Sequence, residues 1–547
     1  MDKVKVSYPS GDVYEVPYGT RLKDLFGTHP LSTEDNPLAV KANNRTVNMS
    51  YRVKSNCQIE LVKKDSTEGM HIYRDSLGYL LCLAAREEIP QLSINISHSL
   101  GDGYYYYSEE EDLSLYTDRL TQRMKVFVQE ALSIDRITLS YEDSIQYFRQ
   151  YKQKQTLELL AHQNSYQVSI YQCGEYWDVA HTTLVDNTKY LDTFELKPYG
   201  QGILLRGPLK GHVNRLASFK DYPKLFNVYQ EYKEWGHILG VSSVGALNKI
   251  NKEKSIPQFI NLAEALQDKK IAQLADKVVA SESKVVLIAG PSSSGKTTFT
   301  KKLSIQLNVL GLETDQISLD DYFLDREKTP LDEHGEYDFE AIEAINVDRL
   351  NDDLLQLFAG QKITLPRFDF KTGVSTDGPR LSLGPKSILL IEGIHGLNPE
   401  LTPRIKRSDK FLIYVSALTQ LNLDNHNRIS TTDNRLIRRI VRDYNFRGYS
   451  ALETIKRWPS VRKGEERNIF PYQESADGHF NSALDYELGV LRGRADLLLR
   501  QIKPYHKEYS EALRLLEFLD NFAMISEITV PPYSILREFI GHSGFHY

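Results

Sequence analysis

The sequence contains few cysteines, no long hydrophobic run and no large excess of charge of either sign. Its three cysteines are widely spaced along 547 residues, so neither a disulfide framework nor a cysteine-based metal site is expected. The longest uninterrupted apolar stretch, Leu77 to Ala85, is far too short to span a bilayer. No basic segment followed by a hydrophobic core opens the chain, which predicts no signal peptide. These absences favour a cytoplasmic protein without a membrane partner.

The composition is that of a globular protein with several domains. Hydrophobic residues make up 41% and charged residues 26% of the chain, which is typical of a soluble globular protein. The length is too great for one core and predicts about two to four domains. A net charge of −6 argues against a generally basic nucleic-acid-binding surface, although local basic patches remain compatible with it.

One glycine-rich loop, Gly290 to Thr297, fits the pattern G-x-x-x-x-G-K-[ST]. The apolar run 284–289 before it reads as a buried strand, and residues 298–310 after it have helical spacing. In this context backbone N–H groups close around a β-phosphate, and the helix N-terminus adds its positive dipole end. Lys296 can reach the β- and γ-phosphates and Thr297 can bind Mg²⁺. The loop therefore predicts a nucleotide phosphate site that uses ATP and Mg²⁺.

Two later strand patterns end in carboxylates. The run 316–323 carries Asp320 and Asp321 at its end, and the run 387–393 carries Glu392. In a parallel sheet these ends lie at the same edge as the phosphate loop. A carboxylate there can accept a hydroxyl proton or hold Mg²⁺. We expect Asp320 to be the base and Glu392 a metal ligand; Asp321 as the base, or a solvated turn, remains the alternative.

Four arginines recur at helical spacing on one predicted helix face: Arg435, Arg438, Arg439 and Arg442. Their guanidinium groups repel each other unless an anion lies among them. A solvated basic face with Asp433 and Asp443 as partners is one interpretation. A lid helix that offers arginine to a γ-phosphate, joined by Arg447 just beyond it, is the other.

The start of the chain reads as a small β-rich unit. Residues 4–8 and 13–16 alternate around a turn and predict a hairpin. Gly19-Thr20 precedes a short predicted helix at 22–26, and 59–62 reads as a closing strand. This order resembles the ubiquitin-like TGS domain of threonyl-tRNA synthetases and some GTPases; another small β-grasp or hairpin unit is the alternative.

The following segment resembles the editing domain of threonyl-tRNA synthetases. Ser97 to Tyr106 is similar to a D-G-F-Y-Y segment of that family, and Gly174 to Val179 to the strand that carries its editing site. The positions that match the family's catalytic histidines and cysteine are Asp75, Tyr79, Ala180 and Leu184. No nucleophilic thiol or histidine cluster is left for water activation. The resemblance therefore implies an editing-like fold without editing chemistry; RNA binding, ligand sensing and homo-oligomer assembly remain open roles.

From about residue 284 to 490 the chain resembles the uridine kinase and phosphoribulokinase family. Besides the phosphate loop, the matching motifs are Ser318 to Phe323, Tyr337 to Glu340, Pro366 to Phe370, Glu392 to Ile394 and Arg438 to Asp443. The resemblance implies Asp320, Lys296 and Arg442 as catalytic residues. It implies Asp338 and Arg439 at the ribose hydroxyls of a nucleoside, and Tyr337 and Phe368 at its base. It implies Thr297 and Glu392 at the metal. For ATP it implies Gly290, Pro291, Ser292, Ser293, Ser294, Gly295, Lys296, Thr297, Thr298 and Arg447.

Two departures from that family affect the choice of base. Phe368 stands where uridine kinases have a tyrosine that touches the base, and the base-reading histidine a few residues on is missing. A pocket without polar contacts discriminates less well. Nucleoside phosphorylation is therefore better supported than the choice of uridine or cytidine.

These patterns together predict a multidomain protein. The expected units are a TGS-like β-grasp domain at 1–64, an α+β editing-like domain at 65–210, a helical linker at 211–280, an α/β P-loop kinase domain with a parallel sheet at 281–495 and a helical extension at 496–547. The expected function is ATP-dependent transfer of a phosphate to a nucleoside 5′-hydroxyl. The alternatives are a kinase of another small hydroxylated metabolite, and an RNA- or ribosome-associated regulator that uses the nucleotide site as a switch.

Overall fold

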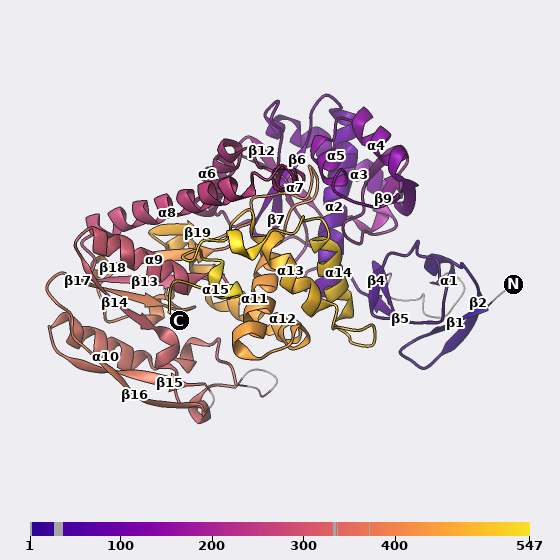
Figure 1. Ribbon diagram of the computed structural model, residues 1–547. Coiled ribbons are helices and arrows are strands. Elements are labelled where there is room, and N and C mark those ends of the chain that lie inside the picture. Colours follow the sequence, from indigo (N-terminus) through magenta and orange to yellow (C-terminus); the bar gives the residue numbers. More distant parts are fainter. Residues whose placement is uncertain are drawn as a thin grey trace.

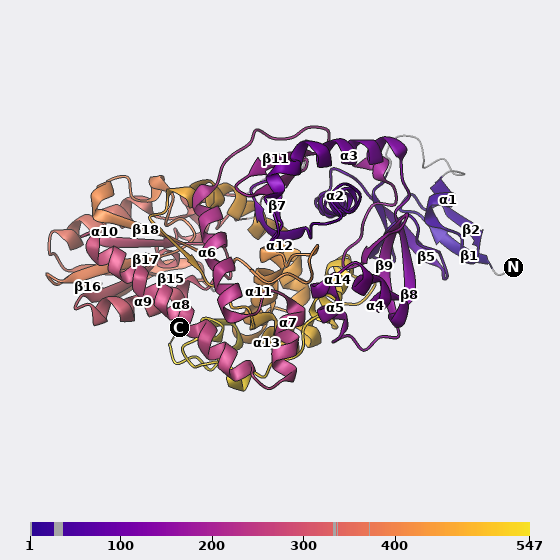
Figure 2. The same cartoon turned by 90° about the horizontal axis from the view of Figure 1, so that it is seen from above.

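The computed structural model describes residues 3–26, 37–209, 211–331, 335, 337–370 and 372–546. The N-terminal β-grasp unit lies at one end of the molecule and the parallel sheet of the C-terminal half at the other (Figures 1 and 2). Within these residues, none of the helices combines the length and the apolar character that crossing a lipid bilayer requires. The predicted multidomain fold, with mixed sheets before an α/β unit, is confirmed.

The first unit is a five-stranded sheet in the order β2-β1-β5-β3-β4. The predicted hairpin is present, because β1 and β2 pair antiparallel; β1 then pairs parallel with β5. Val6, Leu22, Val40 and Ile59 are fully buried between the sheet and the short helix. The elements are β1 (Lys3–Ser7), β2 (Val13–Pro17), α1 (Leu22–Phe26), β3 (Ala39–Ala42), β4 (Arg45–Val47) and β5 (Cys57–Val62).

The editing-like unit combines a four-stranded and a three-stranded sheet around the buried helix α2. The sheet orders are β11-β12-β7-β6 and β10-β9-β8. The Ser66 hydroxyl caps α2 by accepting the N–H of Gly69. The elements are α2 (Thr67–Glu88), β6 (Asn95–Leu100), β7 (Gly103–Tyr107), α3 (Thr117–Glu130), β8 (Asp135–Ser140), α4 (Tyr141–Gln150), α5 (Lys154–Leu160), β9 (Gln167–Cys173), β10 (Tyr176–Val179), β11 (Glu195–Tyr199) and β12 (Gly202–Arg206).

Three helices connect the halves: α6 (Pro223–Leu239), α7 (Val244–Lys252) and α8 (Ile256–Ala280). The stretch predicted as a helical linker thus contains three helices. Leu225 and Tyr229 of α6 pack with Leu100 and Leu204 of the four-stranded sheet, while α8 packs along α9 of the next unit (Figure 1). The connecting helices are therefore part of the packed structure on both sides.

The C-terminal half contains a five-stranded sheet in the order β14-β17-β13-β18-β19, with every neighbouring pair parallel. This is the predicted α/β arrangement. Its strands are β13 (Val285–Ala289), β14 (Glu313–Ser318), β17 (Ser387–Glu392), β18 (Lys410–Ser416) and β19 (Gly478–Asn481); a separate hairpin is formed by β15 (Ile363–Asp369) and β16 (Val374–Leu381). The helices are α9 (Lys296–Val309), α10 (Val347–Phe358), α11 (Thr431–Arg447), α12 (Ala451–Asn468), α13 (Glu487–Leu499), α14 (Tyr509–Leu519) and α15 (Arg537–Ile540).

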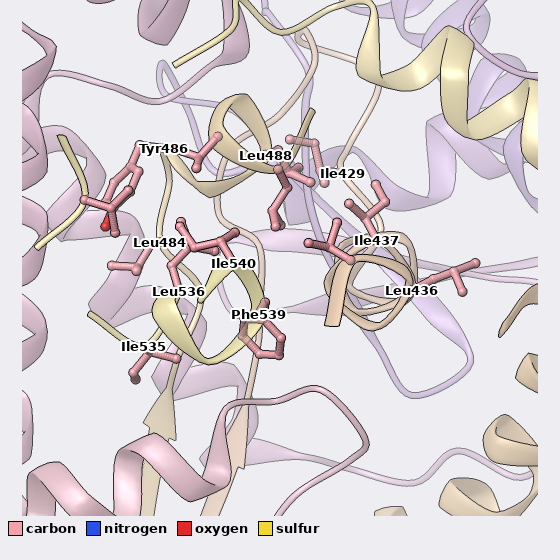
Figure 3. Packing of buried hydrophobic residues seen from close by; sticks show 14 of the residues in the cluster. Ile429, Leu436, Ile437, Leu484, Tyr486, Leu488, Ile535, Leu536, Phe539 and Ile540 are labelled. Carbon is pink, nitrogen blue, oxygen red and sulfur yellow. The ribbon is translucent and has the colours of Figure 1, made fainter. Parts of the chain in front are cut away.

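The C-terminal segment is built into the same core as this sheet. Helix α13 runs across residue 495. Ile535, Leu536 and Phe539 are fully buried and belong to the same buried cluster as Leu436 and Ile437 of α11, which Figure 3 shows close by. This packing places the C-terminal segment against the phosphate-loop unit.

The loop at residues 421–428, between β18 and α11, packs against the editing-like unit. The backbone N–H of Ile96 donates to the Asn425 carbonyl at 2.9 Å, and Asn422 Nδ2 donates to the Ile96 carbonyl at 2.6 Å. Asn425 Nδ2 donates to Asn95 Oδ1 at 2.7 Å. The loop thus hydrogen-bonds to strand β6 through both backbone and side-chain groups.

Two histidine–aspartate contacts cross the same junction. His181 Nε2 lies 2.9 Å from Asp424 Oδ2, and the Asp424 side chain is fully buried. His426 Nδ1 lies 2.8 Å from Asp178 Oδ2. Burial alone would lower the pKa of His426, but Asp178 and Asp424 hold that pKa above its ordinary value. The two pairs therefore join the halves of the chain through polar groups shielded from solvent.

Replacing His181 tests this junction. We expect His181→Ala to lower the free energy of unfolding by about 1–3 kcal/mol, because the buried Asp424 carboxylate loses its partner across the junction. Thermal and urea unfolding of the full chain would measure the loss. His212→Ala, at an exposed position, is the matched control with an expected change below about 0.5 kcal/mol. Equal stability of the two variants would contradict the role given to His181.

Candidate functional site

The phosphate loop lies between β13 and α9, as predicted. Gly295 and Ser293 both have left-handed backbone conformations, with φ values of 79° and 58°. Glycine adopts such values without strain. A side chain at Gly290 would meet the Val415 carbonyl oxygen at 2.0 Å. The close contact between the loop and strand β18 therefore also requires glycine at this position. Lys296 Nζ donates to the Gly290 carbonyl at 2.9 Å and to the Pro291 carbonyl at 3.4 Å. The loop therefore has the backbone shape and the lysine of a phosphate site.

Two of the four arginines of α11 are buried beside this loop. Arg435 Nε donates to the Ser292 carbonyl at 2.9 Å, and Arg438 Nη1 donates to the Ser293 carbonyl at 3.3 Å. Both side chains are at most 1% exposed. Arg435 pairs with Glu465 of α12. The interpretation of a solvated basic face is therefore wrong for Arg435 and Arg438, which instead bind the loop's carbonyl groups.

Arg438 has further partners on α13 and directly after β19. Its Nε donates to Glu487 Oε2 at 2.9 Å, and its Nη2 donates to the Ser482 carbonyl at 2.9 Å. Glu487 is 2% exposed on its side chain. Because each buried guanidinium meets a buried carboxylate and main-chain carbonyls, the cost of removing the charges from water is offset.

The remaining arginines of α11 surround Asp443. Arg439 Nε lies 3.2 Å and Arg442 Nη2 2.9 Å from its carboxylate, and Arg447 Nε lies 3.7 Å away. The predicted partner Asp443 is thus correct, whereas Asp433 pairs with Arg514 of α14 at 2.7 Å. Arg447 is the last residue of the helix rather than a residue beyond it.

The carboxyl ends of the parallel strands meet at the phosphate loop. Ser318 pairs with Glu392, and Ile288 pairs with Glu392 on the other side, so β14, β17 and β13 end at one edge. Thr297 Oγ1 donates to Glu392 Oε1 at 3.1 Å. Burial raises the pKa of Glu392 to about 7, with Lys296 lowering it in part. The two residues predicted to hold the metal are therefore in contact.

Asp320 and Asp321 point toward different neighbours. The Asp320 side chain is exposed, yet the protein around it raises its pKa by desolvation, against the cations of Lys296, Arg447 and Arg442. Desolvation also raises the pKa of Asp321, but the group that lowers it most is the backbone N–H of Phe368. Only Asp320 is close enough to the three cations for them to act on it in this way.

The residues predicted for the nucleoside are not all gathered at one point. Asp338 lies 3.6 Å from Arg467 of α12, whereas Arg439 Nη1 donates to Ser292 Oγ of the phosphate loop at 2.7 Å. Tyr337 is 44% exposed. The Tyr337 side chain is therefore accessible to solvent. Asp338 and Arg439 contact different parts of the protein.

The aromatic residues of the predicted base site lie in two environments. Phe368 is buried, with its ring 5.6 Å from that of Phe323 and 5.1 Å from that of Phe370. Phe370, two positions along, is 55% exposed. The exposed ring next to Phe368 is thus that of Phe370, a residue that the sequence analysis did not single out.

Two further carboxylates of the site escaped the sequence analysis. Burial, together with the nearby charge of Glu465, raises the pKa of Glu340 to about 7, against the lowering effect of Arg439. Glu538, from α15, accepts hydrogen bonds from Thr298. Glu340 lies inside a motif that was recognised, but no local pattern marks Glu538, which is 240 residues from its partner.

The residues present fit ATP and Mg²⁺. Among the described residues, the Ser293 and Ser294 hydroxyls are buried without a hydrogen-bond partner, and phosphate oxygens are suitable acceptors for them. Thr297 and Glu392 provide the hard oxygen ligands that Mg²⁺ prefers, and one or two protein ligands are usual when phosphates complete its coordination.

Comparisons with known proteins agree with both predicted resemblances. Residues 285–487 match the model of the Phosphoribulokinase / Uridine kinase family. The N-terminal half matches threonyl-tRNA synthetases. Threonine–tRNA ligase 2 of Bacillus subtilis is 26% identical over 213 residues, which cover 38% of this chain and 33% of the ligase. Threonine–tRNA ligase 1 of the same organism is 27% identical over 245 residues, 43% of this chain and 38% of the ligase.

The chain spans about a third of the length of these curated relatives. Among solved structures, a possible uridine kinase from Bacillus stearothermophilus is 21% identical with a TM-score of 0.27; the alignment covers 39% of this chain and 98% of that one. A putative fructose transport system kinase from Silicibacter is 16% identical with a TM-score of 0.25, covering 38% of this chain and 98% of that one. At these scores the two structures add no argument; the family match and the site geometry identify a P-loop kinase-type unit in the C-terminal part.

Two adjacent glutamates of α12 test the buried arginine contacts. Glu465→Gln removes the charge beside Arg435, and we expect it to lower the free energy of unfolding by about 3 kcal/mol, because a buried guanidinium is left unneutralised. Glu466 is 65% exposed and, like Glu465, contacts Arg462. Glu466→Gln should therefore cost less than about 1 kcal/mol. Urea unfolding of both variants measures the difference, and similar losses would refute the burial argument.

Proposed function

We propose that the protein is an ATP-dependent phosphotransferase that transfers the γ-phosphate to the 5′-hydroxyl of a nucleoside. Uridine and cytidine are the preferred candidates for that nucleoside. The observation that carries this proposal is the position of Asp320 at the phosphate-loop edge of the sheet, among Lys296, Arg442 and Arg447. A protein that only binds a nucleotide needs the loop, whereas a transferase also needs a base beside it.

The reaction follows from these positions. The Asp320 carboxylate accepts the proton of the substrate hydroxyl while that oxygen attacks the γ-phosphorus, and the bond from the γ-phosphorus to the β–γ bridging oxygen breaks. Lys296, Arg442 and Arg447 offset the negative charge that spreads over the transferred group. Thr297 and Glu392 would hold Mg²⁺, which would further neutralise the charge of the phosphates. The products are a nucleoside 5′-monophosphate and ADP.

The raised pKa of Asp320 suits a general base. A carboxyl with its ordinary pKa is a weak proton acceptor at neutral pH, and desolvation makes it a stronger one. Because the carboxylate must be ionised to accept the proton, activity should fall as the pH drops through this raised pKa. The acidic limb of the pH–rate profile should therefore lie above the ordinary pKa of about 3.9 for aspartate.

The acceptor is less well defined than the chemistry. Tyr337 and Phe370 offer exposed rings, while Phe368 is buried, so stacking rather than hydrogen bonding would hold a base here. Asp338 is the candidate for the ribose hydroxyls, and Arg467 at 3.6 Å orients its carboxylate. Another small hydroxylated metabolite remains the alternative acceptor.

A second candidate function is an RNA- or ribosome-associated regulator with the nucleotide site as its switch. The observation in its favour is the similarity of the N-terminal half to threonyl-tRNA synthetases. Aminoacyl-tRNA hydrolysis is not part of this candidate. Of the positions matching the family's editing residues, Tyr79 and Leu184 are buried and none carries a thiol or an imidazole.

Adjacent aspartates test the assignment of the base. Asp320→Asn should lower kcat by about 10²–10⁴-fold while calorimetric binding of ATP persists, because the phosphate loop is intact. Asp321→Asn should leave kcat within about threefold, since its carboxylate faces the Phe368 backbone N–H. If Asp321→Asn is the more damaging change, the base has been assigned to the wrong residue.

The first assay should follow phosphate transfer from ATP across a panel of nucleosides, with phosphorus NMR or mass detection of the product. We expect a 5′-monophosphate from uridine or cytidine and none with Lys296→Ala, which lacks the cation at the phosphates. Transfer to a purine nucleoside would keep the mechanism and change the specificity. No transfer to any nucleoside would favour another acceptor or the regulator.

A further inference from the structure

Glu538 lies at the N-terminus of the phosphate-loop helix. Its Oε2 accepts a hydrogen bond from the backbone N–H of Thr298 at 3.2 Å and another from the Thr298 hydroxyl at 2.6 Å. Thr298 is the third residue of α9. Helix N–H groups at this position point out of the N-terminus, toward the place where a phosphate loop holds phosphate. A carboxylate of the protein itself thus occupies the two donors of Thr298.

The rest of the segment fixes Glu538 at this place. Ile535 lies against the loop so closely that a side chain on Gly295 would meet its Cγ2 at 2.6 Å. Phe539, the residue after Glu538, is fully buried. The central carbon of the Arg438 guanidinium lies 5.0 Å from the centroid of the Phe539 ring. Asn445 Nδ2 of α11 donates to the Phe539 carbonyl at 2.9 Å. Figure 3 shows Phe539 on the short helix α15 beside α11, with Ile535 just before that helix.

The carboxylate and a nucleotide phosphate have the same requirements. Both are anions, both accept hydrogen bonds, and both are favoured by the positive end of the helix dipole. They cannot occupy the Thr298 donors together, and placing them side by side adds repulsion between like charges. The resemblance to the uridine kinase and phosphoribulokinase family implies Thr298 as an ATP contact, so the competition concerns a predicted residue of the nucleotide site.

We propose that Glu538 is a further residue of the nucleotide site, which takes the place of a phosphate at Thr298 and thereby lowers the affinity for ATP. When the nucleotide binds, the Glu538 side chain leaves Thr298 and the segment 535–541 loosens from the phosphate loop. This inference rests on one part of the proposed function, the binding of ATP by the phosphate loop. It does not depend on which molecule accepts the phosphate.

Calorimetric titration of the full chain with ATP and Mg²⁺ tests the proposal. Glu538→Gln keeps the size and removes the charge, and Glu538→Ala removes the competitor altogether. We expect both to tighten the Kd for ATP by about three- to tenfold, the range of one charge interaction at a helix N-terminus, with the larger effect for alanine. Asp520→Asn is the control: it removes a carboxylate of the same C-terminal segment that pairs with Arg492 and is 55% exposed, and it should leave the Kd unchanged.

Hydrogen–deuterium exchange gives an independent readout. Adding ATP to the wild-type chain should increase exchange of the backbone amides at 535–541, because the segment loses its contact with Thr298. The same peptide should exchange faster in Glu538→Ala before ATP is added. Melting temperatures show whether the variants are folded. If Glu538→Ala does not fold, the Kd for ATP of Glu538→Gln tests the proposal.

The outcomes separate this inference from the proposed function. If the wild-type chain binds no ATP and Lys296→Ala changes nothing, the nucleotide site itself is wrong. If the wild-type chain binds ATP while both Glu538 variants bind it equally well or more weakly, the competition is refuted and the proposed function stands. Weaker binding by both variants would make Glu538 a residue that organises the loop.

Discussion

Two guanidinium groups in the protein interior hold the phosphate loop in place. Arg435 and Arg438 donate to the carbonyls of Ser292 and Ser293, and the backbone N–H of Ser292 donates to Glu465 Oε1 at 3.0 Å, so α11 and α12 hold both kinds of backbone group in the loop. Neither charge could remain buried alone, and Glu465 and Glu487 supply the counter-charges from α12 and α13. The loop, α11, α12 and α13 are thereby connected by buried polar contacts.

The same helix connects the phosphate site to the N-terminal half. Helix α11 begins at Thr431, three residues after Arg428, and the loop before it is held by Asn95, Ile96 and His181 of the editing-like unit. None of the positions that match the family's editing residues carries a thiol or an imidazole in this chain, and the unit has an extensive apolar core. Its remaining polar groups bind a loop of the kinase-type unit. Holding the start of α11 is therefore a structural role for the N-terminal half that requires no chemistry of its own.

Local patterns made the larger part of the fold predictable. The hairpin at β1 and β2 follows from alternation around a turn, and the edge shared by Ser318 and Glu392 follows from the rule that parallel strands end together. The roles of Arg435 and Glu538 could not be read in this way. Their partners are 143 and 240 residues away, and helical spacing alone does not distinguish a buried arginine from a solvated one. Phe368 shows the same limit, because β15 buries it while Phe370 remains exposed.

The C-terminal segment contacts both the β-grasp unit and the phosphate loop, which are far apart in the sequence. The Pro504 carbonyl accepts a hydrogen bond from Asn44 of the β-grasp unit at 2.8 Å, and Glu538 binds Thr298 beside the phosphate loop. Val244 and Phe259 of the connecting helices belong to the same buried core as Phe299 of α9. Cutting the chain at residue 281 would expose this apolar surface, which is costly in water. The phosphate site is therefore a product of the whole chain, since residues from before the kinase-type unit and after it complete its core and reach its loop.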